Sequence, residues 1–390
     1  MKITEVLCHV LVSPSVDVGS TISGQDDFVV EVRTDAGITG FGESDVNPWL
    51  ARTAIEAPGS HTMGRCLRDL LIGADPLDPA AIWDEMYVRS AMNGRRGAVI
   101  HAIGAVDMAL WDIAGKAAGV PTYQLLGPAR RAFVTPYASL LPPAPSYERF
   151  RDTMVQWTVR AQDLGYRAVK LEPLINGPYR HGGLDEPDER ITEIVAACRS
   201  AVGAEMVLMV DVGYAWDDAE RAARTLEQWR DLDVYFIETP LRSDDVAGYA
   251  ELHRANTGIP IATGEWLATR WEFHEALEHG MVDVAQPDIG RVGGLTEALA
   301  VDRLAASLGR RVIPHSVKSH ISAAAAVHFA AVSVDCPYIE YLPQELSDRP
   351  IRHSLTSAHP RVRAGIIELP TEPGLGVIVD PQALARFKVA

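Results

Sequence analysis

The sequence predicts an α/β fold in which a (β/α) barrel is accompanied by a second, α+β domain. After Arg131, short apolar runs alternate with helical stretches, and this alternation is typical of βαβ units around a parallel sheet. The runs number eight, which fits a barrel better than an open sheet. They read VTPYASLL, AVKLEP, MVLMVD, VYFIE, PIATGE, VDVAQPD, RVIPH and YIE.

The region before the barrel mixes strands and helices. Residues 28–43 alternate around a turn at Asp35-Ala36-Gly37 and predict a hairpin. Residues 101–119 predict a helix that ends at Gly119, with Pro121 just beyond. Beyond Ile351 the alternation stops, and the Gly- and Pro-rich segment 365–380 is expected to pack against the N-terminal region. The predicted domains are 1–125, 126–345 and 346–390.

Composition excludes several partner classes. The formal net charge of −16 disfavours nucleic acid, which requires a basic face. No uninterrupted apolar stretch approaches the roughly 20 residues of a membrane span, and the first 19 residues lack the pattern of a signal peptide. The four cysteines are scattered without a CxxC pair. We expect a cytoplasmic protein with a small-molecule partner, no nucleic acid and no membrane.

Ionisable residues recur once per strand-plus-helix unit. The intervals are 27 residues from Asp211 to Glu238, 27 to Glu265, 23 to Asp288, 27 to His315 and 25 to Glu340. Each residue follows an apolar run, and barrel active sites form at the carboxyl ends of the strands. Random solvated charges would not keep to strand ends, so the spacing predicts an active site.

Asp211, Glu238 and Glu265 end three successive strands. Three converging carboxylates repel one another unless a cation neutralises them, and an all-oxygen site suits Mg²⁺, or Mn²⁺, better than zinc. The alternative is that each is an unrelated loop residue or helix cap, which the common register disfavours.

Asp288 and His315 end the next two strands and should be neighbours. A carboxylate that accepts the second N–H of a histidine fixes its tautomer and raises its basicity, so His315 is a candidate general base and acid. Glu340 either contacts a substrate oxygen or pairs with an arginine. Lys170 and Glu172 share one face of their strand, and they form either a surface pair or part of the site.

Three further features have less specific explanations. The segment GRVGG (290–294) lacks the spacing of a phosphate loop and predicts a flexible turn. His320 is expected to be helical and structural. His181, in the polar segment 176–190, is a candidate for a mobile loop over the site.

In this order and spacing, the segments ALWDIAGKAAGVPTYQLLG, VDVGYAW, FIETP, TGEW, QPDIGRVGG, IPHS, IEY and PGLGV resemble the enolase superfamily, mandelate racemase subgroup. The resemblance covers nearly the whole chain. It implies a modified (β/α)7β TIM-like barrel under an α+β capping domain formed from both termini. It further implies Asp211, Glu238 and Glu265 as Mg²⁺ ligands, His315–Asp288 as general acid/base, and Glu340 as a contact of the substrate carboxylate or enediolate. Specificity in this family comes largely from capping-domain loops, here expected at 18–26 and 45–50.

The chain departs from that family at one position. Many members carry Lys-x-Lys at the end of the second strand, whereas this chain has Lys170-Leu171-Glu172. Because the usual second base is missing, we favour a dehydratase that converts an aldonate or aldarate to its 2-keto-3-deoxy acid. His315 would act as the main acid/base, Lys170 would assist or bind the carboxylate, and Glu172 would orient Lys170 or contact a substrate hydroxyl.

Two other functions stay open. One is an epimerase, racemase or cycloisomerase of sugar acids or their lactones that uses Lys170 opposite His315. The other is a non-catalytic sugar-acid binding protein. The sequence does not identify the sugar or its stereochemistry, and the family suggests a homo-oligomer, a dimer or an octamer.

Overall fold

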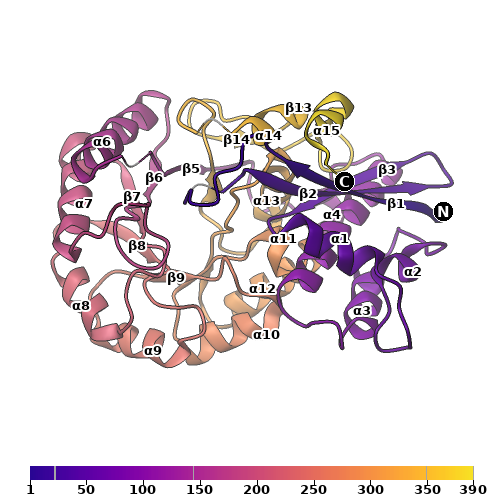
Figure 1. Cartoon of the computed structure of the whole chain (residues 1–390), viewed down its shortest axis with the longest axis horizontal. Helices are drawn as coiled ribbons and strands as arrows, with labels where there is room; N and C mark the ends of the chain where they lie inside the picture. The colour runs from indigo at the N-terminus through magenta and orange to yellow at the C-terminus, as the bar shows by residue number, and fades with distance from the viewer. Residues whose placement is uncertain (22, 144, 348, 390) are drawn as a thin grey trace.

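The computed structural model describes residues 1–21, 23–143, 145–347 and 349–389. Figure 1 shows two parts side by side: a barrel of strands ringed by helices, and a smaller part in which the first strands, the helices of the N-terminal region and the last helix lie together. Both chain ends lie on this smaller part, so the C-terminal tail returns to the N-terminal sheet.

The N-terminal sheet is antiparallel, in the order β1-β2-β3. Its strands are β1 (Ile3–Val12), β2 (Asp26–Thr34) and β3 (Thr39–Ser44). The predicted hairpin is confirmed as β2 and β3, and Gly37 provides the positive φ of 75° that the tight turn needs. Five helices follow: α1 (Pro48–Glu56), α2 (Leu67–Leu71), α3 (Pro79–Arg89), α4 (Ala98–Ala118) and α5 (Thr122–Leu126).

Helix α4 packs directly on β3, and small residues make the close approach possible. Gly40 and Gly42 lie two apart on one face of β3, and a Cβ at either would collide with the carbonyl oxygen of Ala109 or Ala105, respectively. The predicted helix is confirmed, and it begins three residues earlier than expected and ends at Gly119 in the left-handed conformation.

Among the described residues, α4 is also the one helix long and apolar enough to cross a bilayer. Most of it is enclosed, since 78% of its most apolar 18-residue stretch is buried, as in the core helix of a soluble protein.

The barrel strands are all parallel, in the order β11-β10-β9-β8-β7-β6-β5-β12, so the last strand pairs with the first. All eight predicted strands are confirmed: β5 (Pro136–Leu140), β6 (Ala168–Leu171), β7 (Val207–Asp211), β8 (Val234–Glu238), β9 (Ile261–Thr263), β10 (Val284–Ala285), β11 (Arg311–Val312) and β12 (Ile339–Tyr341). The helices between them are α6 (Tyr147–Asp163), α7 (Asp188–Val202), α8 (Ala219–Glu227), α9 (Val246–Ala255), α10 (Thr269–His274) with the π-helical turn η1 (Glu275–His279), α11 (Ile289–Val292), α12 (Leu295–Ser307) and α13 (His320–Val332).

One apolar layer fills the barrel and sets the direction of the residues above it. The layer takes one residue from each of seven consecutive strand segments: Tyr137, Ala168, Met209, Phe236, Ala262, Val284 and Ile313. Because strand side chains alternate between faces, the residue two positions later also points inward, one layer nearer the carboxyl end. From five of the segments this gives Lys170, Asp211, Glu238, Gln286 and His315.

The C-terminal segment pairs both with itself and with segments far away in sequence. Strand β14 (Ile367–Glu368) pairs with β4 (Phe133–Val134), and β13 (Thr356–Ala358) pairs with β15 (Ile378–Val379). The short helices α14 (Pro350–Ser354) and α15 (Pro381–Phe387) complete the segment. Backbone hydrogen bonds join Thr122 to Gly374 and Val389 to Val10. The last of these bonds ties the end of the tail to β1 of the N-terminal sheet; the domain limits at 125 and 345 stay a prediction.

The two parts meet at the carboxyl ends of the barrel strands. Glu43 of β3 accepts hydrogen bonds from the backbone N–H groups of Ser319 and Ser322, which begin α13, at 2.9 Å each. Gly104 of α4 allows α11 to approach so closely that a Cβ would strike the carbonyl oxygen of Gly290. The turn that follows Asp288 is therefore fixed by the N-terminal part.

We predict that Gly42→Ala destabilises the protein by about 1–3 kcal/mol or more, because the added methyl group must displace the backbone of α4. Thermal unfolding followed by circular dichroism should show a lower midpoint. Gly182→Ala is the matched control, since a Cβ there meets no atom within 4 Å. Equal midpoints for the two variants would contradict the close β3–α4 packing.

Candidate active site

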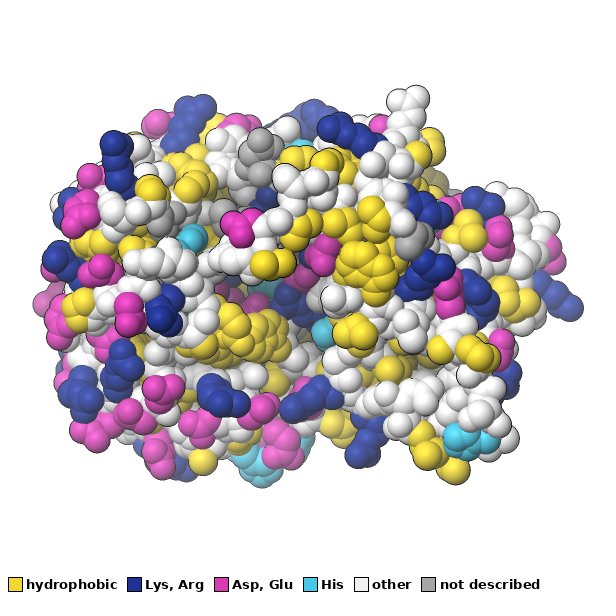
Figure 2. All heavy atoms as spheres, viewed as in Figure 1, with side chains coloured by type: hydrophobic (Ala, Val, Ile, Leu, Met, Phe, Trp, Pro, Cys, Tyr) yellow, Lys and Arg dark blue, Asp and Glu magenta, His cyan; other side chains and the backbone are white. Residues whose placement is uncertain are grey.

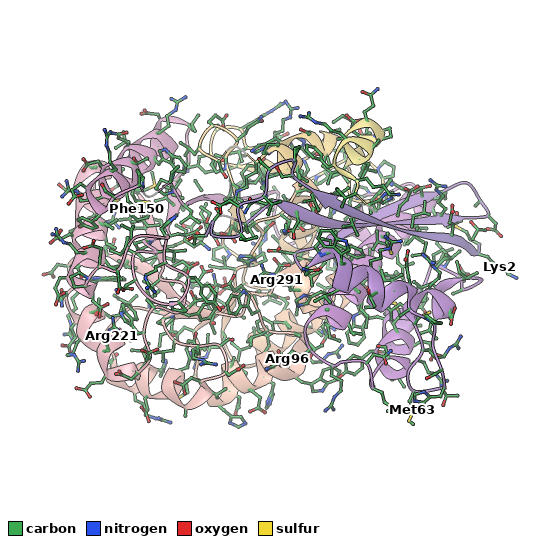
Figure 3. The ribbon with its side chains drawn as sticks, viewed as in Figure 1. Lys2, Met63, Arg96, Phe150, Arg221 and Arg291 are labelled. Atoms are coloured by element: carbon green, nitrogen blue, oxygen red, sulfur yellow. The ribbon has the colours of Figure 1, made fainter. Side chains whose placement is uncertain are left out.

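The structure brings the predicted site residues to one end of the barrel. Asp211 and Glu238 are the last residues of β7 and β8 and are register partners. Glu265, Asp288 and His315 follow β9, β10 and β11 by two or three residues, and Glu340 is the central residue of β12. Figure 3 shows Arg291, which follows Asp288, where this end of the barrel meets the N-terminal part.

Lys170 lies at the centre of the carboxylates and is 1% exposed. Its ammonium nitrogen is 2.7 Å from Glu340 Oε1, 3.0 Å from Glu238 Oε1 and 3.8 Å from Asp211 Oδ2. The partners of Lys170 are thus barrel-interior carboxylates, and Glu172 instead accepts a hydrogen bond from the Ser139 hydroxyl. Lys170 therefore belongs to the site interior and not to the surface.

Burial and mutual repulsion shift these carboxylates in different directions. Burial raises the pKa of Asp211 to about 7, an effect that Lys170 opposes and Glu265 reinforces. Burial also raises the pKa of Glu238 well above its usual value, and repulsion from Asp211, Glu340 and Glu265 adds to the rise. For Glu340, burial is outweighed by Lys170 and His315, which lower its pKa to about 2. Of these three carboxylates, only Glu340 has neighbouring cations that outweigh the cost of burying its charge.

His315 and Asp288 form the predicted pair. His315 Nδ1 is 2.8 Å from Asp288 Oδ2, and Nε2 faces Glu265 Oε2 at 3.3 Å and Glu340 Oε2 at 3.8 Å. Burial disfavours the charged imidazole, but Glu340, the Asp288 hydrogen bond and Glu265 outweigh it and raise the pKa of His315 to about 9. Asp288 therefore orients the ring so that Nε2 points into the site.

Asp288 is held from its other side by the backbone. Its Oδ1 accepts hydrogen bonds from the N–H groups of Gly290 and Arg291, at 2.9 and 3.0 Å, and so caps α11. The predicted turn after Asp288 is thus a short helix. Since Gly290 packs on Gly104 and its carbonyl accepts from the Ser44 hydroxyl at 2.9 Å, the N-terminal part fixes Asp288 and, through it, His315.

Four charged residues that the sequence reasoning did not assign to the site connect it to the N-terminal part. Arg291 pairs with Asp45 and lies 3.3 Å from Glu265 Oε2. Lys318 pairs with Asp45 at 2.8 Å and with Asp26 at 3.1 Å. Asp26 and Asp45 belong to the two loops expected to determine specificity. Arg291 belongs to the segment that the sequence interpreted as a flexible turn. Its role was missed because its charge partners are remote in sequence.

Neighbouring polar groups orient the three candidate metal ligands. Tyr214 donates to Glu265 Oε1 at 2.9 Å, the Thr239 hydroxyl donates to Asp211, and Gln286 Nε2 donates to Glu238 Oε2 at 2.6 Å. Gln286 lies two positions after the barrel-filling Val284. That offset, applied to every strand, is the sequence signal that would have found it.

The donor set fits a hard divalent cation. The ligands are buried carboxylates, and burial raises the pKa of two of them, so a cation would stabilise their ionised forms. Their oxygens are not gathered within 4.8 Å of one another; within the described ranges only the exposed His274, Glu275 and His279 meet that spacing. Instead, the Lys170 ammonium lies beside Asp211 and Glu238.

His320 and His181, the two further histidines considered in the sequence, lie outside this cluster. His320 begins α13 and stacks on His359, with ring centroids 3.6 Å apart, so the expectation of a helical, structural residue is confirmed. His181 lies in the loop between β6 and α7, but it is buried against Phe150, 5.3 Å between ring centroids. In this loop residues 176–180, rather than His181, line the neighbouring cavity.

That cavity has a volume of about 830 Å³ and lies beside Glu265, to which one of its lining residues, Tyr214, donates a hydrogen bond. Tyr214 and Trp266 stack at 4.3 Å, and Tyr179 meets both rings edge-on. Figure 2 shows the surface hollowed near the centre of this face, with hydrophobic side chains along its edge. A cavity large enough for a small molecule therefore lies next to the candidate metal ligand Glu265.

Comparison with known proteins identifies both parts of the chain. Residues 2–127 match the mandelate racemase / muconate lactonizing enzyme N-terminal domain. Residues 153–383 match the enolase C-terminal domain-like family.

Named relatives include the L-rhamnonate dehydratase of Saccharopolyspora erythraea, 32% identical over 92% of this chain and 84% of the relative. The arabinonate dehydratase of Saccharolobus solfataricus is 30% identical over 92% of this chain and 89% of the relative.

Solved structures agree with the sequence matches. The 3,6-anhydro-D-galactonate cycloisomerase of Zobellia galactanivorans is 28% identical, with a TM-score of 0.86 over 100% of both chains. A racemase from Streptomyces coelicolor with bound magnesium is 27% identical, with a TM-score of 0.83 over 99% of this chain and 100% of the racemase. The fold is therefore a TIM-like barrel with a separate capping domain, and the chain belongs to the mandelate racemase subgroup of the enolase superfamily.

Proposed function

We propose that this protein is a Mg²⁺-dependent dehydratase that removes water from an aldonate or aldarate to give a 2-keto-3-deoxy sugar acid. The observation that carries the proposal is the Asp288–His315 pair, in which His315 Nε2 faces the candidate metal ligand Glu265 and the candidate substrate contact Glu340. The named dehydratase relatives support a hydro-lyase that acts on a small-molecule carboxylate. We further propose a cytoplasmic homo-oligomer.

In this mechanism one histidine transfers the proton. His315 Nε2 takes the proton from the carbon next to the substrate carboxylate, while Asp288 holds Nδ1 and stabilises the charged ring. The imidazolium then gives the proton to the β-hydroxyl, the C–O bond breaks, and water leaves. The resulting enol takes up a proton at the adjacent carbon and loses its hydroxyl proton as it becomes the 2-keto acid. This sequence requires both groups on the same face of the substrate.

The remaining residues bind and orient. Asp211, Glu238 and Glu265 would hold Mg²⁺, which supplies positive charge where negative charge develops on the substrate carboxylate as the α-proton leaves. A magnesium-bound racemase of the same fold supports this choice of ion. Glu340 is held by Lys170 and by the Ser316 N–H at 2.8 Å, and we assign it a substrate contact. Lys170 is placed to assist at the substrate carboxylate.

A second candidate is an epimerase or cycloisomerase, and the cycloisomerase neighbour favours it. Lys170 lies next to Glu340 Oε1, and His315 lies next to Glu340 Oε2. Two groups on opposite faces of a substrate are what epimerisation needs.

The deciding experiment is a screen of acid sugars with Mg²⁺ that detects 2-keto-3-deoxy products. Dehydration predicts a product that disappears with chelator and returns with Mg²⁺. Exchange of the α-proton with deuterated water in the absence of water loss would support the second candidate instead. No reaction of either kind would contradict both.

We predict that His315→Asn abolishes turnover, with a loss of at least about 100-fold, because no other group replaces the proton acceptor. Circular dichroism should show a native fold, and product formation is the measurement. His253→Asn is the matched control, since His253 pairs with Asp283 at 3.6 Å beside the amino ends of the strands. Wild-type turnover in His315→Asn would exclude the proposed mechanism.

We predict that Glu238→Gln weakens Mg²⁺ binding by at least about tenfold, because a charged ligand becomes neutral. Titration calorimetry on the purified protein measures this directly, without substrate. Glu227→Gln on the exposed face of α8 controls for the change in net charge. Unchanged affinity in Glu238→Gln would remove this residue from the ligand set.

A further inference from the structure

Two buried arginines beside the site form no ion pair with any of the described carboxylates. Arg349, before α14, is 6% exposed, and Arg352, within α14, is 2% exposed. Neither forms an ion pair with a carboxylate within the described part of the chain. A buried cation without a counter-charge is strongly unfavourable, so such residues require another explanation.

Arg352 has local partners that account for part of its position. Its Nη1 donates to the carbonyl oxygen of Lys318, and its guanidinium lies 5.6 Å from the centre of the Tyr341 ring. Its Nε and Nη2 are nevertheless buried without a hydrogen-bond partner. Arg352 also repels Arg349 electrostatically, which makes an anion near the two more favourable.

Among the described residues, the hydrogen-bond partners of Arg349 are neutral. Its Nε donates to the Ser347 hydroxyl at 3.0 Å and its Nη1 to the Ser23 hydroxyl at 3.1 Å. Burial lowers its pKa to about 10, so it stays charged at neutral pH, with Glu172, Asp45 and Glu340 acting in the opposite direction. These three carboxylates are site residues, so Arg349 lies at the same end of the barrel.

The capping loop covers Arg349. Ser23 belongs to the loop between β1 and β2, and a Cβ at its neighbour Gly24 would lie 3.0 Å from Arg349 Cδ. The same loop continues to Asp26, which pairs with Lys318. Arg349 thus lies under the capping loop and within electrostatic reach of Glu172, which follows β6, whereas Asp288 and His315 follow β10 and β11.

We propose that Arg349 binds a second carboxylate of the substrate, so that the preferred substrate is a dicarboxylic acid sugar rather than a monocarboxylic one. This inference rests on the proposed dehydratase function and narrows its substrate class. The planar guanidinium matches a carboxylate in geometry and charge, whereas a terminal hydroxymethyl group would leave the buried cation uncompensated. The first carboxylate stays with the metal ligands, and the second extends beneath the capping loop.

The test compares an aldarate with the aldonate of the same chain length and configuration, on wild-type protein with Mg²⁺. We expect kcat/KM to favour the aldarate by at least about 30-fold. Equal or better turnover of the aldonate would overturn this inference and leave the dehydratase function intact. Turnover of no acid sugar at all would overturn the dehydratase function, and with it the basis of this inference.

Substitution of Arg349 separates direct contact from long-range attraction. Arg349→Gln should lower kcat/KM for the aldarate by about 30-fold or more, mainly through KM, and leave the aldonate nearly unchanged. Arg349→Lys should recover part of the loss. Arg254→Gln, on the exposed last turn of α9, is the control for the change in net charge. Equal losses in the Arg349→Gln and Arg254→Gln variants would contradict a direct contact. If Arg349→Gln does not fold, the wild-type preference still decides.

Discussion

The compensation of buried carboxylates by buried cations is the constraint on which this site depends. The carboxyl ends of the barrel strands place Asp211, Glu238 and Glu340 around one ammonium group, that of Lys170. One cation does not balance three anions, and the raised pKa values of Asp211 and Glu238 express the remaining cost of burial. A divalent cation would remove this cost, which is why the geometry and the proposed metal chemistry agree.

The capping domain is part of the same electrostatic arrangement. Arg291 connects Asp45 of the capping domain to the candidate ligand Glu265, and Lys318 connects Asp45 to Asp26. The close approach of α4 and α11 at Gly104 adds a rigid contact next to Asp288. The geometry of the candidate site and the position of the capping loops are therefore coupled, because the same charged side chains stabilise both.

The frame of this chain is shared with its relatives. The barrel and the capping domain follow the family, and solved structures that are 27–28% identical cover 99–100% of this chain. The proposed chemistry depends on Lys170-Leu171-Glu172 and on Arg349. The first departs from the Lys-x-Lys that many family members carry, and the second is a buried cation beneath the capping loop that forms no ion pair with a carboxylate among the described residues.

The sequence by itself determined the eight strands, the hairpin, the long helix and the ionisable residues at the strand ends, because these follow from local periodicity and from the spacing of one βα unit. Residues such as His315 and Asp288 could be paired in advance, since consecutive parallel strands are neighbours. Only the tertiary structure decided the partners of Lys170, the bridging role of Arg291 and the burial of Arg349 beneath the capping loop. Those contacts join residues tens to hundreds of positions apart, and their energies depend on burial and on distance, which no local pattern encodes.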